Sequence, residues 1–111
     1  MNRTVLALVI SLLAASPLFA QNADAIQRGQ KVYAAEKCNI CHSIGTVGNR
    51  KGPLDDVGSR LTSDQIRDWI THAPEMTAKT KAERKPAMKA YPNLNKEDLE
   101  ALVSYLASLK K

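Results

Sequence analysis

The stretch CNICH at residues 38–42 decides the fold of this chain. It contains both cysteines of the 111-residue sequence, three positions apart, and a histidine follows the second one directly. A disulfide between these thiols would close a very short loop and would constrain the unfolded chain little. A zinc site needs a second pair of ligands, and a thioredoxin-type dithiol needs a βαβ setting. We see neither, because His72 is the only other histidine and no βαβ pattern is present.

The pattern CxxCH is typical of covalent haem attachment. Two thiols on one helical turn can form thioether bonds with the two vinyl groups of a porphyrin. The imidazole that follows is then held on one side of the ring, where it can coordinate the iron. The sequence therefore predicts one haem c, with its iron, attached through Cys38 and Cys41 and ligated axially by His42.

The N-terminus has the pattern of an export signal. Arg3 precedes an apolar run at residues 5–15, which is shorter than the roughly 20 residues needed to span a bilayer. Pro17 and small residues follow, so we expect cleavage after Ala20 or, as an alternative, after Ala25. An uncleaved membrane anchor is the other possibility for this segment.

Cleavage of a signal peptide at residues 1–20 would leave residues 21–111 as one monohaem domain, expected in the periplasm and without a membrane span. A domain of roughly 90 residues is small for a purely apolar core, and a covalently bound haem would supply a central surface for packing. The full chain has a formal charge of +5, but aromatic residues make up only 5% of it. Since bases need aromatic stacking platforms, we expect no nucleic-acid partner.

Three helices separated by loops are expected, with no strand pair. The first helix would begin with Asp24 as its N-cap and would end before the cysteine motif. The second would begin with a capping box of Thr62 and Gln65 and would end at Pro74. The last would begin with Asn95 as its N-cap. Residues 43–61 and 75–93 are expected to be loops, so the fold class is all-α.

Beyond the motif, the sequence resembles the class I cytochromes c, which are small soluble proteins with a single haem. In that family a glycine, followed four residues later by an aromatic residue, lies where the N-terminal helix crosses the C-terminal one. The C-terminal helix contributes a leucine and, three residues later, another aromatic residue. Gly29, Tyr33, Leu102 and Tyr105 match these positions. The resemblance implies the cytochrome c-like fold, with three main helices and long loops around one covalently bound haem.

The resemblance also implies further contacts with the haem and its ligands. Pro53 would accept a hydrogen bond from the proximal histidine through its carbonyl. Met88 would be the second axial ligand, since it lies 14 residues before the matching Leu102. Met76, His72 and an open coordination site are the alternatives to Met88. Trp69 resembles an aromatic residue that can donate to a haem propionate, although a core position would explain it equally well.

The function implied is that of a single-electron carrier that shuttles electrons between redox proteins and is not an enzyme. One alternative is a subunit bound permanently to a periplasmic dehydrogenase, and another is a five-coordinate haem protein that reacts with peroxide or a small gas. The expected partners are an acidic electron donor and an acidic electron acceptor, and we expect the protein to be a monomer. Exposed cations before and after the proposed ligand would dock these partners. These are Lys79, Lys81, Arg84, Lys85 and Lys89.

Overall fold

The structure is a computed structural model that describes residues 18–111. The predicted signal peptide falls mainly on residues 1–17, outside the described residues. The two proposed cleavage points, after Ala20 and after Ala25, fall within the first helix, α1 (Leu18–Ala35). None of the helices in residues 18–111 is both long enough and apolar enough to cross a membrane.

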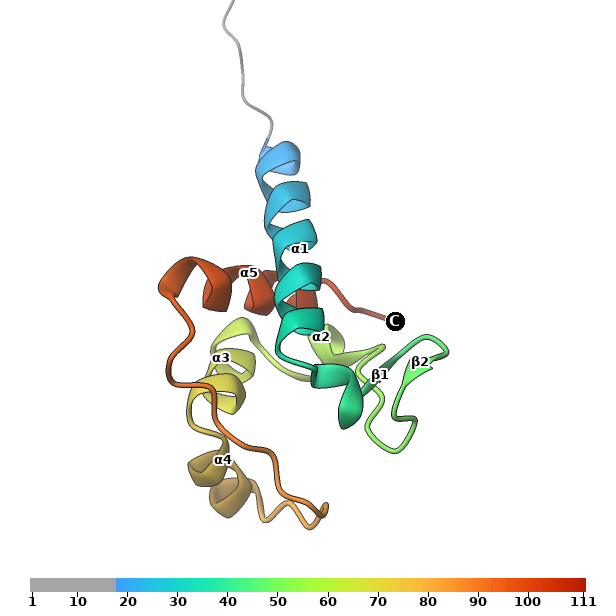
Figure 1. Ribbon diagram of the computed structural model, residues 1–111, viewed down its shortest axis with the longest axis vertical. Helices are drawn as coiled ribbons and strands as arrows, with labels where there is room; N and C mark the ends of the chain where they lie inside the picture. Colours follow the sequence, from blue (N-terminus) through green and yellow to red (C-terminus); the bar gives the residue numbers. More distant parts are fainter. Residues whose placement is uncertain (1–17) are drawn as a thin grey trace, which may run out of the picture.

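The described chain is mostly helical, as predicted (Figure 1). Helix α1 crosses α5, the last helix, and α3 packs against another side of α5. The short α2 lies at the end of α5, and α4 follows α3 directly. The elements after α1 are η1, a 3-10 turn (Cys38–Ile40), β1 (Ser43–Ile44), β2 (Val47–Gly48), α2 (Val57–Arg60), α3 (Ser63–Thr71), α4 (Ala73–Thr80) and α5 (Lys96–Ala107).

Two of the three predicted helix starts are confirmed by their caps. The Thr62 hydroxyl accepts a hydrogen bond from the Gln65 N–H at 3.1 Å, and the Gln65 side chain accepts one from the Thr62 N–H at 2.9 Å. The Asn95 side chain accepts from the Asp98 N–H at 2.8 Å. Such caps satisfy N–H groups that have no partner within the helix.

The predicted start of the first helix at Asp24 was wrong, because α1 already begins at Leu18. The residues between them include neither glycine nor proline, so nothing in the local sequence stops the helix from extending. Asp24 is therefore an exposed residue within α1 and not its N-cap.

The two segments predicted as loops also contain regular structure. Helix α3 ends at Thr71, three residues before Pro74, and Pro74 lies in the first turn of α4, where a missing backbone N–H does no harm. His72 is both the C-cap of α3 and the N-cap of α4, so no linker separates the two helices.

In the other segment predicted as a loop, residues 43–61, β1 and β2 pair in antiparallel register, and Gly45 in their turn has a φ of 59°. A glycine adopts that left-handed conformation without strain.

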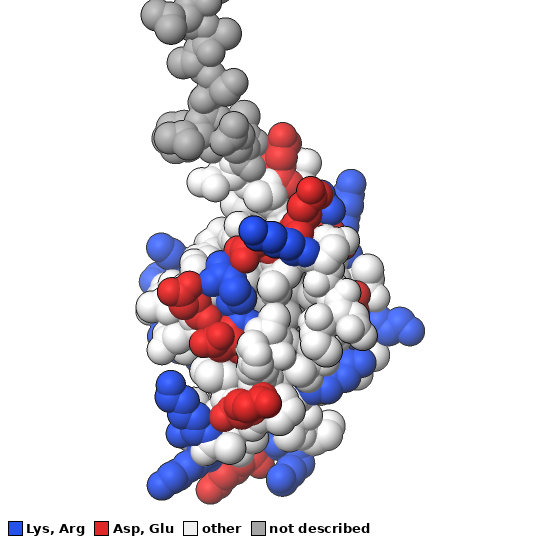
Figure 2. All heavy atoms as spheres, turned by 90° about the vertical axis from the view of Figure 1, so that its left-hand side faces the viewer, with Lys and Arg blue, Asp and Glu red and all other residues white. Residues whose placement is uncertain are grey.

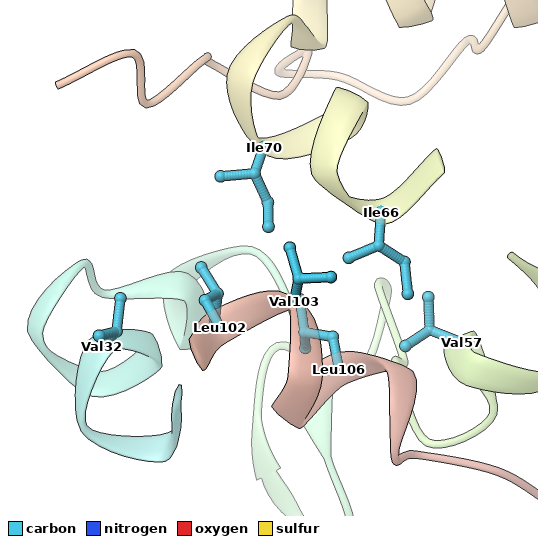
Figure 3. Packing of buried hydrophobic residues seen from close by; sticks show 7 residues of the cluster. All are labelled: Val32, Val57, Ile66, Ile70, Leu102, Val103 and Leu106. Atoms are coloured by element: carbon cyan, nitrogen blue, oxygen red, sulfur yellow. The ribbon is translucent and has the colours of Figure 1, made fainter. Parts of the chain in front are cut away.

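The apolar core is built around α5 (Figure 3). Val103 and Leu106 of α5 face Ile66 and Ile70 of α3, and Leu102 faces the side of α1. Burial of such side chains stabilises the fold by about 1.5–3 kcal/mol each. The cluster consists of Val32, Val57, Ile66, Ile70, Leu102, Val103 and Leu106.

Helices α1 and α5 touch backbone to backbone at Gly29, which is buried. A Cβ atom on Gly29 would overlap the Ala101 carbonyl oxygen and the Cβ of Tyr105. One turn further along α1, the rings of Tyr33 and Tyr105 meet edge to face, with centroids 5.9 Å apart. The predicted crossing is therefore confirmed, and Leu102 beside it packs into the core.

Ion pairs tie both neighbouring helices to α5. Arg28 of α1 donates to Asp98 at 2.8 Å and to Glu97 at 2.9 Å. Arg67 of α3 donates two hydrogen bonds to Glu100, at 2.8 and 2.7 Å. The guanidinium of Arg67 holds the pKa of Glu100 below its usual value. These groups are partly exposed, so solvent screens the ion pairs and they add little to the stability of the fold.

Replacing Gly29 with alanine tests the close crossing. Gly29→Ala is expected to lower the free energy of unfolding by about 1–3 kcal/mol, because the added Cβ forces α1 and α5 apart. This loss outweighs the roughly 1 kcal/mol by which alanine is favoured over glycine in a helix. Denaturant unfolding followed by circular dichroism measures the change. The control is Gln30→Ala at the exposed neighbouring position, expected within about 0.5 kcal/mol of wild type. Equal stability of the two variants would contradict the crossing.

Candidate functional site

The two cysteines lie in the tight turn that follows α1. Lys37, with a φ of 56°, turns the chain out of the helix, and η1 begins at Cys38. The Cys38 carbonyl accepts hydrogen bonds from the N–H groups of Cys41, at 3.2 Å, and His42, at 2.9 Å. Cys38 and Cys41 are half-buried, and no disulfide joins them. The turn thus presents two thiols and an imidazole within five residues.

The Cys38 thiol is in an apolar and slightly negative environment. Burial, followed by the nearby Glu36, raises the pKa of Cys38 to about 11. Burial also raises the pKa of Tyr33 to about 12, with a further contribution from Cys38. The Tyr33 hydroxyl is buried and has no hydrogen-bond partner in residues 18–111. A thiol kept protonated is a poor metal ligand and a poor redox dithiol, since both roles require the thiolate.

His42 is held in one orientation by the backbone. Its Nδ1 lies 3.0 Å from the Gly52 carbonyl oxygen, which can only accept, so Nδ1 carries the proton and donates. Burial lowers the pKa of His42, which favours the neutral imidazole. A neutral ring with a protonated Nδ1 has its lone pair on Nε2, where it can bind iron.

The prediction that Pro53 accepts this hydrogen bond was wrong by one residue. Ser43 forms a parallel bridge with Pro53, in which the Ser43 N–H donates to the Gly52 carbonyl at 3.1 Å and the Leu54 N–H donates to the Ser43 carbonyl at 2.9 Å. Successive carbonyls of an extended chain point to opposite sides. The carbonyl of Gly52 therefore faces His42, whereas that of Pro53 faces away.

The proposed ligand Met88 lies between two fixed points of the segment that connects α4 to α5. We call residues 81–91 of this segment the strap. The Arg84 side chain donates to the Cys41 carbonyl, and the Tyr91 N–H donates to the Ile70 carbonyl at 2.8 Å. Met88 between them is half-buried. The strap is thus attached to the cysteine turn on one side of Met88 and to α3 on the other.

The alternative ligands occupy different positions. Met76 is half-buried within α4 and not in the strap. His72 is exposed between α3 and α4, and its Nδ1 is paired with the Thr71 hydroxyl at 2.8 Å. Trp69 is half-buried on α3 and does not belong to the apolar cluster around α5. The core position that we considered as an alternative for Trp69 is therefore not what the structure shows.

The predicted docking cations are all exposed, but they are not equivalent. Figure 2 shows basic and acidic side chains together on the face formed by α3, α4 and the start of α5, and the lower end carries several basic side chains with acidic ones between them. Within residues 18–111 none of the five forms an ion pair with a carboxylate. The Lys89 amine lies 5.0 Å from the centre of the Tyr91 ring, and Arg84 is bonded to Cys41.

Sequence reasoning missed the contacts made by Arg84 and by the Gly52 carbonyl. In the sequence, nothing distinguishes Arg84 from the other basic residues of the same predicted loop. Gly52 stood next to the predicted acceptor, but only the bridge between Ser43 and Pro53 determines which carbonyl faces the ring.

The residues at this site fit a covalently attached haem. Two unpaired, half-buried thiols lie one turn apart, as its vinyl groups require. The imidazole beside them has its second nitrogen occupied by the backbone, as expected for a metal-binding histidine. A thioether on the strap can supply a further ligand.

Comparisons with known proteins agree with this site. A family model described as Cytochrome c matches residues 26–110. Cytochrome c oxidase subunit 2 of Alkalihalophilus pseudofirmus is 29% identical over 92 residues, which are 75% of this chain and 25% of that protein. The chain thus spans about a quarter of the length of this curated relative. No solved structure gives a significant match.

Proposed function

Because the chain belongs to the cytochrome c family, we propose that it is a one-electron carrier with one haem c, attached at Cys38 and Cys41 and ligated by His42 and Met88. The observation that carries the proposal is the hydrogen bond from His42 Nδ1 to the Gly52 carbonyl, in a turn whose two thiols are unpaired. When bound, the haem supplies an iron that accepts and gives up one electron.

The residues of the site have separate tasks in this function. Cys38 and Cys41 tether the ring, while the Gly52 carbonyl fixes the orientation of His42 and makes its Nε2 a stronger ligand. Met88 would supply a neutral thioether as a further iron ligand, which would raise the reduction potential. Such a ligand would leave no free position on the iron for a substrate, so we propose an electron carrier and not an enzyme.

The charge of the exposed strap supports acidic redox partners. A positive rim attracts an acidic donor or acceptor and speeds encounter, and salt weakens the attraction by screening. Export to the periplasm, with removal of the segment up to Ala20 or Ala25, places the protein where such carriers work. We propose a monomer that meets its partners transiently.

A second candidate is a cytochrome that works inside a larger assembly. The similarity to part of a cytochrome c oxidase subunit 2 favours it, since that relative is four times longer than the matched region. A permanent complex with a periplasmic dehydrogenase is the related alternative. Isolation of the native protein in a stable complex would favour both over a free carrier.

A five-coordinate haem protein reacting with peroxide or a small gas is the third alternative, which the methionine variants below test.

Covalent haem attachment is the first test. The mature protein is expected to have the mass of its polypeptide plus one haem, and acidified solvent should not extract the haem. The Cys38→Ser, Cys41→Ser double variant should carry no covalent haem and should be largely unfolded, because its helices lose a packing surface. Intact mass and circular dichroism measure both effects. His72→Asn serves as the control and should keep its haem. An unmodified polypeptide mass for the wild type would rule out the proposed function.

The identity of the sixth ligand is tested by substituting the two methionines. Met88→Ala should abolish the sulfur-to-iron charge-transfer band of the oxidised protein and lower the reduction potential, because the iron loses its thioether ligand. Met76→Ala is the matched control and should change neither property. Absorption spectra and redox titration measure them. The opposite result would assign the ligand to Met76, and a wild type without the band would exclude methionine ligation and leave His72 or an open coordination site.

Docking through the strap is tested by reversing charge. In the Lys81→Glu, Lys85→Glu double variant, electron transfer with flavodoxin, an acidic redox protein, should slow roughly tenfold or more at low salt. The difference should shrink as salt is added, because screening removes the steering. Stopped-flow spectroscopy measures the rates. The control is Lys110→Glu, Lys111→Glu, the same charge change at the C-terminus, far from α4 in Figure 1. Equal rates for the two double variants would mean that docking does not use the strap.

A further inference from the structure

Arg84 reaches back to the cysteine turn across 43 residues of sequence. Its Nη2 donates to the carbonyl oxygen of Cys41, which belongs to the peptide bond between Cys41 and His42. The backbone hydrogen bonds within the turn use the carbonyls of Lys37 and Cys38 as their acceptors, and no backbone N–H of the described residues donates to that of Cys41. Arg84 therefore supplies the Cys41 carbonyl with a partner that the turn itself does not provide.

The same guanidinium covers Gly52. A Cβ atom on Gly52 would overlap Arg84 Nη1 and the Cys41 carbonyl oxygen. The Gly52 carbonyl in turn accepts the proton of His42 Nδ1. Arg84 thus lies against both backbone segments that hold the proximal imidazole.

Arg84 differs in this respect from its basic neighbours. Within the described chain, Lys79, Lys81 and Lys85 are exposed and take part in no side-chain hydrogen bond or ion pair. Arg84 also has no carboxylate partner there, so its charge is not neutralised by the protein. A guanidinium stays charged at every accessible pH, and its planar set of donors suits a carbonyl acceptor.

We propose that Arg84 is a positioning residue, which fastens the strap to the haem-attachment turn and keeps a fixed positive charge beside His42. The inference deepens the proposed function and rests on it, because it concerns the haem that His42 and Met88 would ligate. It also revises the role of Arg84, which acts within the protein and is not one of the docking cations.

Two consequences follow for the bound haem. Arg84 precedes Met88 by only four residues, so release of its hydrogen bond loosens the part of the strap that carries the thioether. Oxidised iron carries one more positive charge than reduced iron, and a nearby cation therefore disfavours the oxidised form. Arg84 thus strengthens Met88 ligation and raises the reduction potential.

The test compares Arg84→Gln and Arg84→Lys with the control Lys85→Gln, which removes one charge from the neighbouring position of the strap. Added imidazole competes with Met88 for the iron, so its affinity reports how firmly the strap is closed. Arg84→Gln should bind imidazole about tenfold more tightly than Lys85→Gln, since a hydrogen bond from a charged donor is lost. Its reduction potential should be lower than that of the control. Arg84→Lys should restore most of the potential but only part of the resistance to imidazole, because lysine keeps the charge without the planar donors.

Equal imidazole affinity and equal potential in Arg84→Gln and Lys85→Gln would overturn the proposal. If Arg84→Gln fails to fold, Arg84→Lys decides: imidazole affinity unchanged from wild type would overturn the proposal, and tighter binding would support it. Failure of the proposed function is recognised separately, in the wild type, by a missing covalent haem or a missing sulfur-to-iron band.

Discussion

The backbone contact between α1 and α5 at Gly29 sets the geometry on which the site depends. It brings the end of α1, and with it the cysteine turn, to a fixed place relative to the helix that forms the centre of the core. Because α3 packs on another side of α5, the same helix also positions Ile70, to which the strap is attached. The two sides of the proposed haem site are therefore aligned through α5, although they lie far apart in the sequence.

Backbone hydrogen bonds near the cysteine turn then determine how His42 is oriented. The parallel bridge between Ser43 and Pro53 brings residues 50–54 back against the cysteine turn, and its register selects Gly52 as the acceptor for His42. The lack of a side chain at Gly52 leaves room for the Arg84 guanidinium over the same backbone. One glycine thus allows contacts with both His42 and the strap.

The sequence predicted those features that depend on short spacings. CxxCH, the capping box at Thr62 and the N-cap at Asn95 are local patterns, and the helix crossing at Gly29 follows from a family resemblance. It did not predict α4, because a proline that ends one helix can equally begin the next. Nor did it distinguish the carbonyl of Gly52 from that of Pro53 or Arg84 from the neighbouring lysines, since those differences arise only from long-range packing.

The hydrogen bond from the Tyr91 N–H to the Ile70 carbonyl has a consequence for how fast electrons move. Ile70 is only 3% exposed and is part of the core, so this end of the strap is attached to the buried core. Electron transfer is fast when the groups around the iron change position little between its two oxidation states. Fixed, preorganised surroundings need little rearrangement when charge changes. By anchoring the strap to the core, the Tyr91 contact would limit the rearrangement of the strap around a bound haem when the iron changes its charge.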